Sequence, residues 1–170
     1  MLHLSNKFAS MVQTNTDIII EEWMDKIDSD IGLENFSSTN QDYIKLEGKN
    51  LLKNLKEWIG YNKTKNDIGK KYVAVGRKLF ELEIPICDAH QALSMLKRLI
   101  WRHITVMSLP DSALEMNQCL EFFERIILFF DRAEYYLFRG YTEKMNQKIK
   151  STWKLSDKDT EQIFFKNSFY

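Results

Sequence analysis

The stretch Met116–Tyr141 reads MNQCLEFFERIILFFDRAEYYLFRGY and decides the fold class of this chain. Apolar residues recur along it at alternating steps of four and three, a heptad rhythm that indicates one long amphipathic helix. A helix of roughly 30 residues extends for about 45 Å, so we expect it to project beyond a small domain. The members of the heptad series are Met116, Leu120, Phe123, Ile127, Phe130, Glu134, Leu137 and Tyr141.

The apolar surface of this helix is wider than one partner helix needs, because a flanking stripe joins the heptad series. This width fits either packing within one core or a face that also buries a second subunit. Glu134 is the kind of polar seam residue that can set the register of a dimer. The flanking stripe consists of Cys119, Phe122, Ile126, Phe129, Ala133 and Tyr136. The predicted homodimer interface consists of Phe123, Ile127, Phe130, Glu134, Leu137 and Tyr141.

Helical spacing continues through the rest of the chain, and strand-like alternation does not stand out. Gly76 lies inside one of these patterns, and a helical glycine costs about 1 kcal/mol relative to alanine, which suggests close helix contact there. The sequence therefore predicts an all-α, globin-like bundle of five to six helices with a long C-terminal helix. The further helices are expected over Ser5–Ile27, Asn40–Ile59, Ile68–Leu82 and Ile86–Met107.

Local signals refine these boundaries. Thr16-Asp17 could cap a second helix inside the first stretch, and Asp111 is a good N-cap for the long helix. Ser156 with Asp159 three residues on looks like a relaxed capping box for a short terminal helix. We therefore expect one helical sensor domain over residues 1–150 and a tail with a short helix over residues 151–170.

Composition excludes several classes of protein. Lys and Arg total 24 and Asp and Glu total 24, so bulk electrostatics would not hold this chain on nucleic acid. Six glycines are few for a phosphate-binding loop, and two cysteines do not make a disulfide framework. Neither a signal peptide nor a membrane span is recognisable. We expect a cytoplasmic protein that engages neither nucleic acid nor membrane.

The histidines and carboxylates do not form a recognisable catalytic or metal-binding pattern. His90 and His103 are thirteen residues apart and point to different helix faces, so they cannot share a metal. His103 adjoins the apolar stripe, where it is either an axial haem ligand or a partly buried structural histidine. A base–nucleophile pair is not apparent, so an enzyme is not expected. The candidate ligand pocket consists of Trp101, His103, Ile104 and Met107.

The stretch Tyr72–Ile104 reads YVAVGRKLFELEIPICDAHQALSMLKRLIWRHI. Together with Glu21-Glu22-Trp23, it resembles the N-terminal non-haem globin-like sensor domain of RsbR-type stressosome proteins. In that family an early helix carries a Trp after acidic residues, and an Arg-bearing helix precedes a second Leu- and Arg-containing helix. The resemblance covers most of residues 8–141.

The resemblance implies a bacterial, haem-free homodimer that senses an input for an output module. Such domains usually precede a STAS, kinase or cyclase module, whereas only about 29 residues follow Tyr141 in this sequence. The chain is therefore expected either to stand alone and act on a separate signalling output protein, or to be part of a longer protein. The alternative function is a haem-binding gas or redox sensor that uses His103.

Overall fold

The computed structural model describes residues 2–34, 36, 41–60, 64–105, 112–154, 156 and 158–159. Over these ranges the chain is helical and contains no strand, which confirms the all-α prediction. The globin-like arrangement remains a prediction. The elements are α1 (Leu2–Asp28), the 3-10 helix η1 (Ile31–Leu33), α3 (Gln41–Ile59), α4 (Lys65–Glu81), α5 (Ile86–Thr105) and α6 (Ala113–Trp153).

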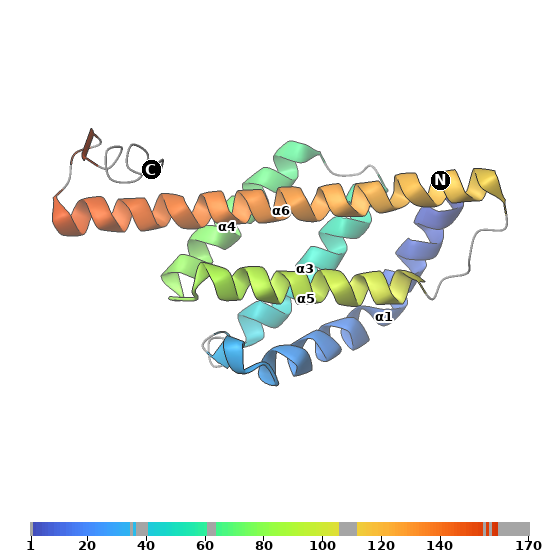
Figure 1. Cartoon of the computed structure of the whole chain (residues 1–170), viewed down its shortest axis with the longest axis horizontal. Coiled ribbons are helices and arrows are strands. Elements are labelled where there is room, and N and C mark those ends of the chain that lie inside the picture. The colour runs from blue at the N-terminus through green and yellow to red at the C-terminus, as the bar shows by residue number, and fades with distance from the viewer. Residues whose placement is uncertain are drawn as a thin grey trace, which may run out of the picture.

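Helix α6 is longer than its apolar pattern predicts. It contains 41 residues, which corresponds to about 60 Å, and in Figure 1 it extends past the ends of α4 and α5. The Ser112 side chain caps it by accepting a hydrogen bond from the Glu115 amide at 3.2 Å, and the predicted cap, Asp111, lies outside the described residues. The helix continues beyond Tyr141 because residues 142–153 include three lysines and one each of Glu, Met and Gln, which favour helix, and contain neither glycine nor proline.

The other boundaries follow from local hydrogen bonds. The predicted split of the first helix at Thr16-Asp17 is wrong, because the Thr16 hydroxyl donates back to the Val12 carbonyl within a continuous α1. Helix α4 starts before Ile68 because Thr64 and Asp67 form a capping box.

The predicted capping contacts of the tail are present. The Ser156 amide donates to the Asp159 carboxylate at 3.0 Å, and the Asp159 amide donates to the Ser156 hydroxyl at 3.3 Å. These are the reciprocal bonds of a capping box, which satisfy two amides at the start of a helix. Residues 160–170 lie outside the described ranges, so the length of the terminal helix is still a prediction.

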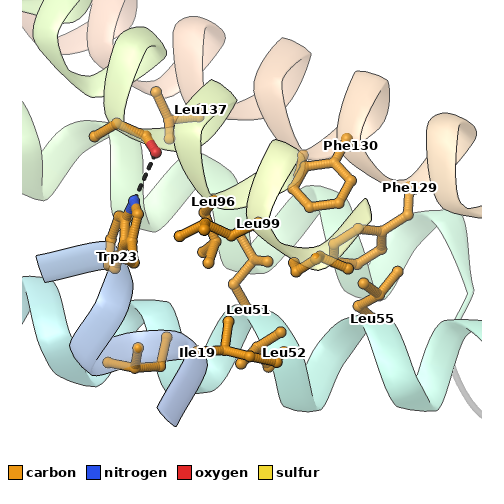
Figure 2. Close-up of a cluster of buried hydrophobic side chains, with 14 of the residues drawn as sticks. Ile19, Trp23, Leu51, Leu52, Leu55, Leu96, Leu99, Phe129, Phe130 and Leu137 are labelled. Carbon is orange, nitrogen blue, oxygen red and sulfur yellow. Dashed lines mark hydrogen bonds between the residues drawn. The ribbon is translucent and has the colours of Figure 1, made fainter. Parts of the chain in front are cut away.

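One apolar core contains residues of α1, α3, α4, α5 and α6, and Figure 2 shows members of it from α1, α3, α5 and α6. Ile19 comes from α1, Leu52 and Leu55 come from α3, and Phe129 and Phe130 come from α6, all almost completely buried. Burial of side chains of this size is the main favourable contribution to folding. Trp23 connects α1 to α5, because its indole Nε1 donates to the Ala92 carbonyl at 2.8 Å.

Two glycines allow the backbones of α4 and α6 to touch. A Cβ atom on Gly76 would lie 1.9 Å from the Leu137 carbonyl oxygen, and a Cβ atom on Gly140 would lie 2.0 Å from the Val73 carbonyl oxygen. Each glycine therefore faces the main chain of the other helix. The close contact predicted at Gly76 is confirmed, and its counterpart is Gly140.

Ion pairs reinforce this helix pair at its surface. Glu143 of α6 is 2.7 Å from Arg77 of α4 and 3.1 Å from Arg139, and Lys144 is 2.9 Å from Glu81 of α4. Arg77, assisted by Arg139, holds the pKa of the Glu143 carboxyl below its ordinary value of 4.5. Lys144 likewise lowers the pKa of Glu81.

Acidification should weaken the contact between α4 and α6. Because the pKa of Glu143 is lower in the folded state, its stabilising contribution is present above 4.5 and is lost as the pH falls through the folded pKa. We expect Glu143→Gln to unfold at lower urea concentration than the wild type near pH 7, and the difference to shrink near pH 3. Urea unfolding of both proteins at the two pH values measures this. A difference that stays constant across this range would show that Glu143 stabilises the fold by packing alone.

Candidate functional site

The predicted dimer residues do not share one exposed face. Phe130 and Leu137 are buried in the chain's own core, so they are not available to a second chain. This corrects the seam that the heptad series predicts. The physical reason is that α6 turns these two positions toward α5 and the centre of the bundle, where the core needs large apolar side chains.

The remaining seam residues have different surroundings. The Phe123 ring lies 4.6 Å from the Trp101 ring of α5, and the Tyr141 ring lies 5.2 Å from the Phe80 ring of α4. Glu134 pairs with His90 of α5. These three side chains are half-buried within the monomer, whereas Ile127 is 48% exposed.

Helix α6 does expose an apolar face, on the side away from the core. Leu120 and Ile127 are seven residues apart, as are Leu128 and Tyr135, and these four side chains are between 38% and 61% exposed. A spacing of seven places the members of each pair two turns apart on one side of the helix. Contiguous exposed apolar residues mark candidate interaction sites. We define the α6 outer face as Leu120, Glu121, Glu124, Ile127, Leu128, Asp131 and Tyr135.

A groove between α5 and α6 adjoins this face. It has a volume of about 500 Å³ and is lined by Lys97, Arg98, Trp101, Arg102, Ile126 and Ile127. Trp101 is 40% exposed although its ring packs against Phe123. Trp and Arg are the residue types most enriched among those that dominate binding energy at protein interfaces. The groove therefore offers an aromatic anchor surrounded by cations.

The charges of the groove and of the α6 outer face are opposite. The groove carries Lys97, Arg98 and Arg102 from α5, whereas the outer face carries exposed Glu121, Glu124 and Asp131. Arg102 also pairs with Glu22 of α1. Within the described part of the chain, neither Glu124 nor Asp131 forms an ion pair. The two surfaces are thus complementary in charge and contiguous at Ile127.

The predicted ligand pocket is not assembled from its four residues. Trp101 lines the surface groove, and Ile104 is buried in the core. His103 is half-buried, with its Nε2 atom 3.5 Å from a Glu22 carboxylate oxygen. Met107 lies outside the described residues. The sequence predicted this pocket because the four residues are close together on one helix. That closeness does not specify which way each side chain faces.

The surroundings of His103 do not fit an axial haem ligand. The Nε2 nitrogen, which would coordinate iron, faces the Glu22 carboxylate, whose pKa is lowered by Arg102 and also by His103. His103 lines neither the groove nor the apolar cavity at the centre of the bundle. The buried Nε2 atom forms no hydrogen bond within the described residues, so its 3.5 Å contact with Glu22 joins α5 to α1 only loosely.

The described residues contain no grouping of three or more His, Cys, Asp or Glu side chains that could hold a metal ion. In the same part of the chain, none of the helices combines the length and the apolar character of a bilayer-spanning segment. The surface made by the groove and the α6 outer face has the strongest physical signature, because exposed Trp101, Leu120 and Ile127 lie there beside charged side chains.

Comparison of this chain with protein-family models finds no match. Comparison with curated protein sequences also finds no match. The family resemblance in residues 8–141 therefore stays a prediction.

Proposed function

We propose that this chain is a non-enzymatic sensory domain that forms a homodimer through the α5–α6 groove and the α6 outer face. The observation that carries the proposal is the apolar, acidic α6 outer face beside a basic groove. The exposed apolar residues of that face are Leu120, Ile127, Leu128 and Tyr135. A two-fold dimer uses the same patch on both subunits, so the patch must be self-complementary. This surface meets that requirement, because the acidic residues of the α6 outer face on one subunit can face the basic residues that α5 contributes to the groove of the other.

The proposed signal passes along α6. This helix contributes Phe129 and Phe130 to the core, presents the outer face to the partner, and continues to Trp153. Its last contacts with α4 include the Lys144–Glu81 pair and Lys148 over the Phe80 ring. A small shift of α6 at the dimer interface would move its free end, as helix shifts do in other signalling proteins. A globin-like packing and the resemblance to RsbR-type sensor domains agree with this proposal.

Substitution of Ile127 by aspartate is expected to make the protein monomeric. A charge at the centre of the interface would be buried without a partner, so the dissociation constant should rise by at least about 30-fold. Size-exclusion chromatography with light scattering across micromolar concentrations measures the oligomeric state. Ile18→Asp is the matched control, because Ile18 is a 57% exposed isoleucine on α1. A monomeric wild-type protein, or equal effects of the two variants, would contradict the proposed interface.

A charge exchange tests the pairing of the two helices. Arg98→Glu and Glu124→Arg should each weaken the dimer, because each places like charges at the proposed interface. The double variant should recover much of the lost affinity, since the opposite charges then face each other in exchanged positions. Two single effects that simply add in the double variant would show that these residues do not pair across the interface.

A further inference from the structure

An apolar cavity lies between the helices. It has a volume of about 60 Å³, and α1, α3, α4, α5 and α6 each contribute to its wall. Representative lining residues are Trp23 of α1, Leu51 of α3, Val75 of α4, Ala92 and Leu96 of α5, and Leu137 of α6. Figure 2 shows Trp23, Leu51, Leu96 and Leu137 around this region of the core. The space exists partly because small side chains occupy positions in the wall where larger ones would fill it.

The chemistry of the wall favours an apolar occupant over water. A buried water molecule needs two to four polar partners. The indole N–H of Trp23 is already used by the Ala92 carbonyl, and the Glu47 carboxylate pairs with Lys71 at 3.5 Å and accepts a hydrogen bond from Asn50 at 3.2 Å. Tyr72 also lines the cavity, and its buried hydroxyl lacks a hydrogen-bond partner among the described residues, which gives a water molecule one polar contact there. Apolar cavities of about 150 Å³ stay dry and take up benzene or xenon, so a cavity of about 60 Å³ suits the smaller of these, xenon.

We propose that this cavity is a regulatory binding site for a small, uncharged, apolar molecule. The proposal rests on the proposed sensory function, for which this molecule would be the input. Leu137 connects the cavity to the output helix, because its side chain lines the cavity while its carbonyl oxygen faces Gly76 at the crossing of α4 and α6. Occupancy of the cavity therefore acts on the contact that sets the position of α6 relative to α4.

Xenon is a suitable probe of the wild-type cavity, and benzene is a probe of an enlarged one. In amide and indole NMR spectra of the full chain, xenon should shift the signals of Trp23, Ala92 and Leu137. Ala92→Leu fills the cavity and should abolish these shifts. Ala74→Leu makes the same change at an exposed position of α4 and should leave them intact. Leu93→Ala enlarges the cavity at a half-buried lining residue and should allow benzene to shift the same signals.

The regulatory role is tested on the dimer. Xenon should change the dimer dissociation constant of the wild type by about threefold, an effect of under 1 kcal/mol, and should leave that of Ala92→Leu unchanged. Xenon binding without any change in the dimer constant would overturn the regulatory role. Absence of probe shifts in both the wild type and Leu93→Ala would overturn the site itself, even if Ala92→Leu fails to fold. A monomeric protein that still binds xenon would instead reject the proposed dimer and leave the binding site standing.

Discussion

Gly140→Ala is expected to lower the free energy of unfolding by about 3 kcal/mol or more. The added methyl carbon would lie 2.0 Å from the Val73 carbonyl oxygen, a distance at which two atoms overlap. Backbone atoms cannot move aside as a side chain can, so α4 and α6 would have to separate along their whole contact. Such a loss is a large part of the 5–15 kcal/mol that typically stabilises a domain. Urea unfolding followed by circular dichroism measures the change.

Gly76→Ala should have a similar effect, because its methyl carbon would lie 1.9 Å from the Leu137 carbonyl oxygen. The double variant should lose less than the sum of the two single losses, since one substitution already separates the helices. Gly69→Ala is the matched control on α4. Its methyl carbon would meet only the Tyr136 ring, at 3.0 Å or more, and a ring can rotate away. Equal losses at Gly69 and Gly140 would refute the proposed backbone contact.

Trp23→Ala should be the most damaging single truncation in the core, with an expected loss of about 4 kcal/mol. Trp23 is only 5% exposed, and its indole is hydrogen-bonded to the Ala92 carbonyl at 2.8 Å. The substitution removes a large apolar surface and the hydrogen bond at once. Its place in the wall means that the existing cavity would also grow. Urea unfolding at neutral pH measures the loss.

Two further variants separate how much the ring and the N–H donor of Trp23 each contribute to stability. Trp23→Phe keeps a ring but removes the N–H donor, so its loss should be smaller than that of Trp23→Ala. Trp153→Ala is the control, because Trp153 is 73% exposed near the end of α6 and its loss should stay within about 0.5 kcal/mol. Comparable losses for Trp23→Ala and Trp153→Ala would mean that burial of Trp23 does not stabilise the fold.

The helices could be predicted because their signals are local. Apolar residues at steps of three and four place α3, α4 and α5 within a few residues of their observed bounds. Gly76, inside the α4 pattern, indicated a close helix contact correctly. Gly140 was missed, since its counterpart carbonyl belongs to Val73, which is remote in sequence.

The interface and pocket residues were harder to predict. The heptad series correctly indicates that α6 is amphipathic, but it does not say whether its apolar side meets the same chain or another one. The structure assigns Phe130 and Leu137 to the core and leaves Ile127 exposed. Helical spacing likewise does not say which way the side chains of the predicted pocket face. Trp101 lines the groove, His103 faces a carboxylate and Ile104 is buried in the core, although the three are close neighbours on α5.

The sequence by itself determined that this chain is helical, where most of its helices lie, and that its last helix is long and amphipathic. These properties depend on residues within one or two turns of each other, where periodicity and capping act. Only the tertiary structure decided which face of α6 is exposed, which partner each glycine meets, and that the described helices leave a cavity between them. Those features depend on the relative rotation of helices, which is set by packing among residues far apart in the chain.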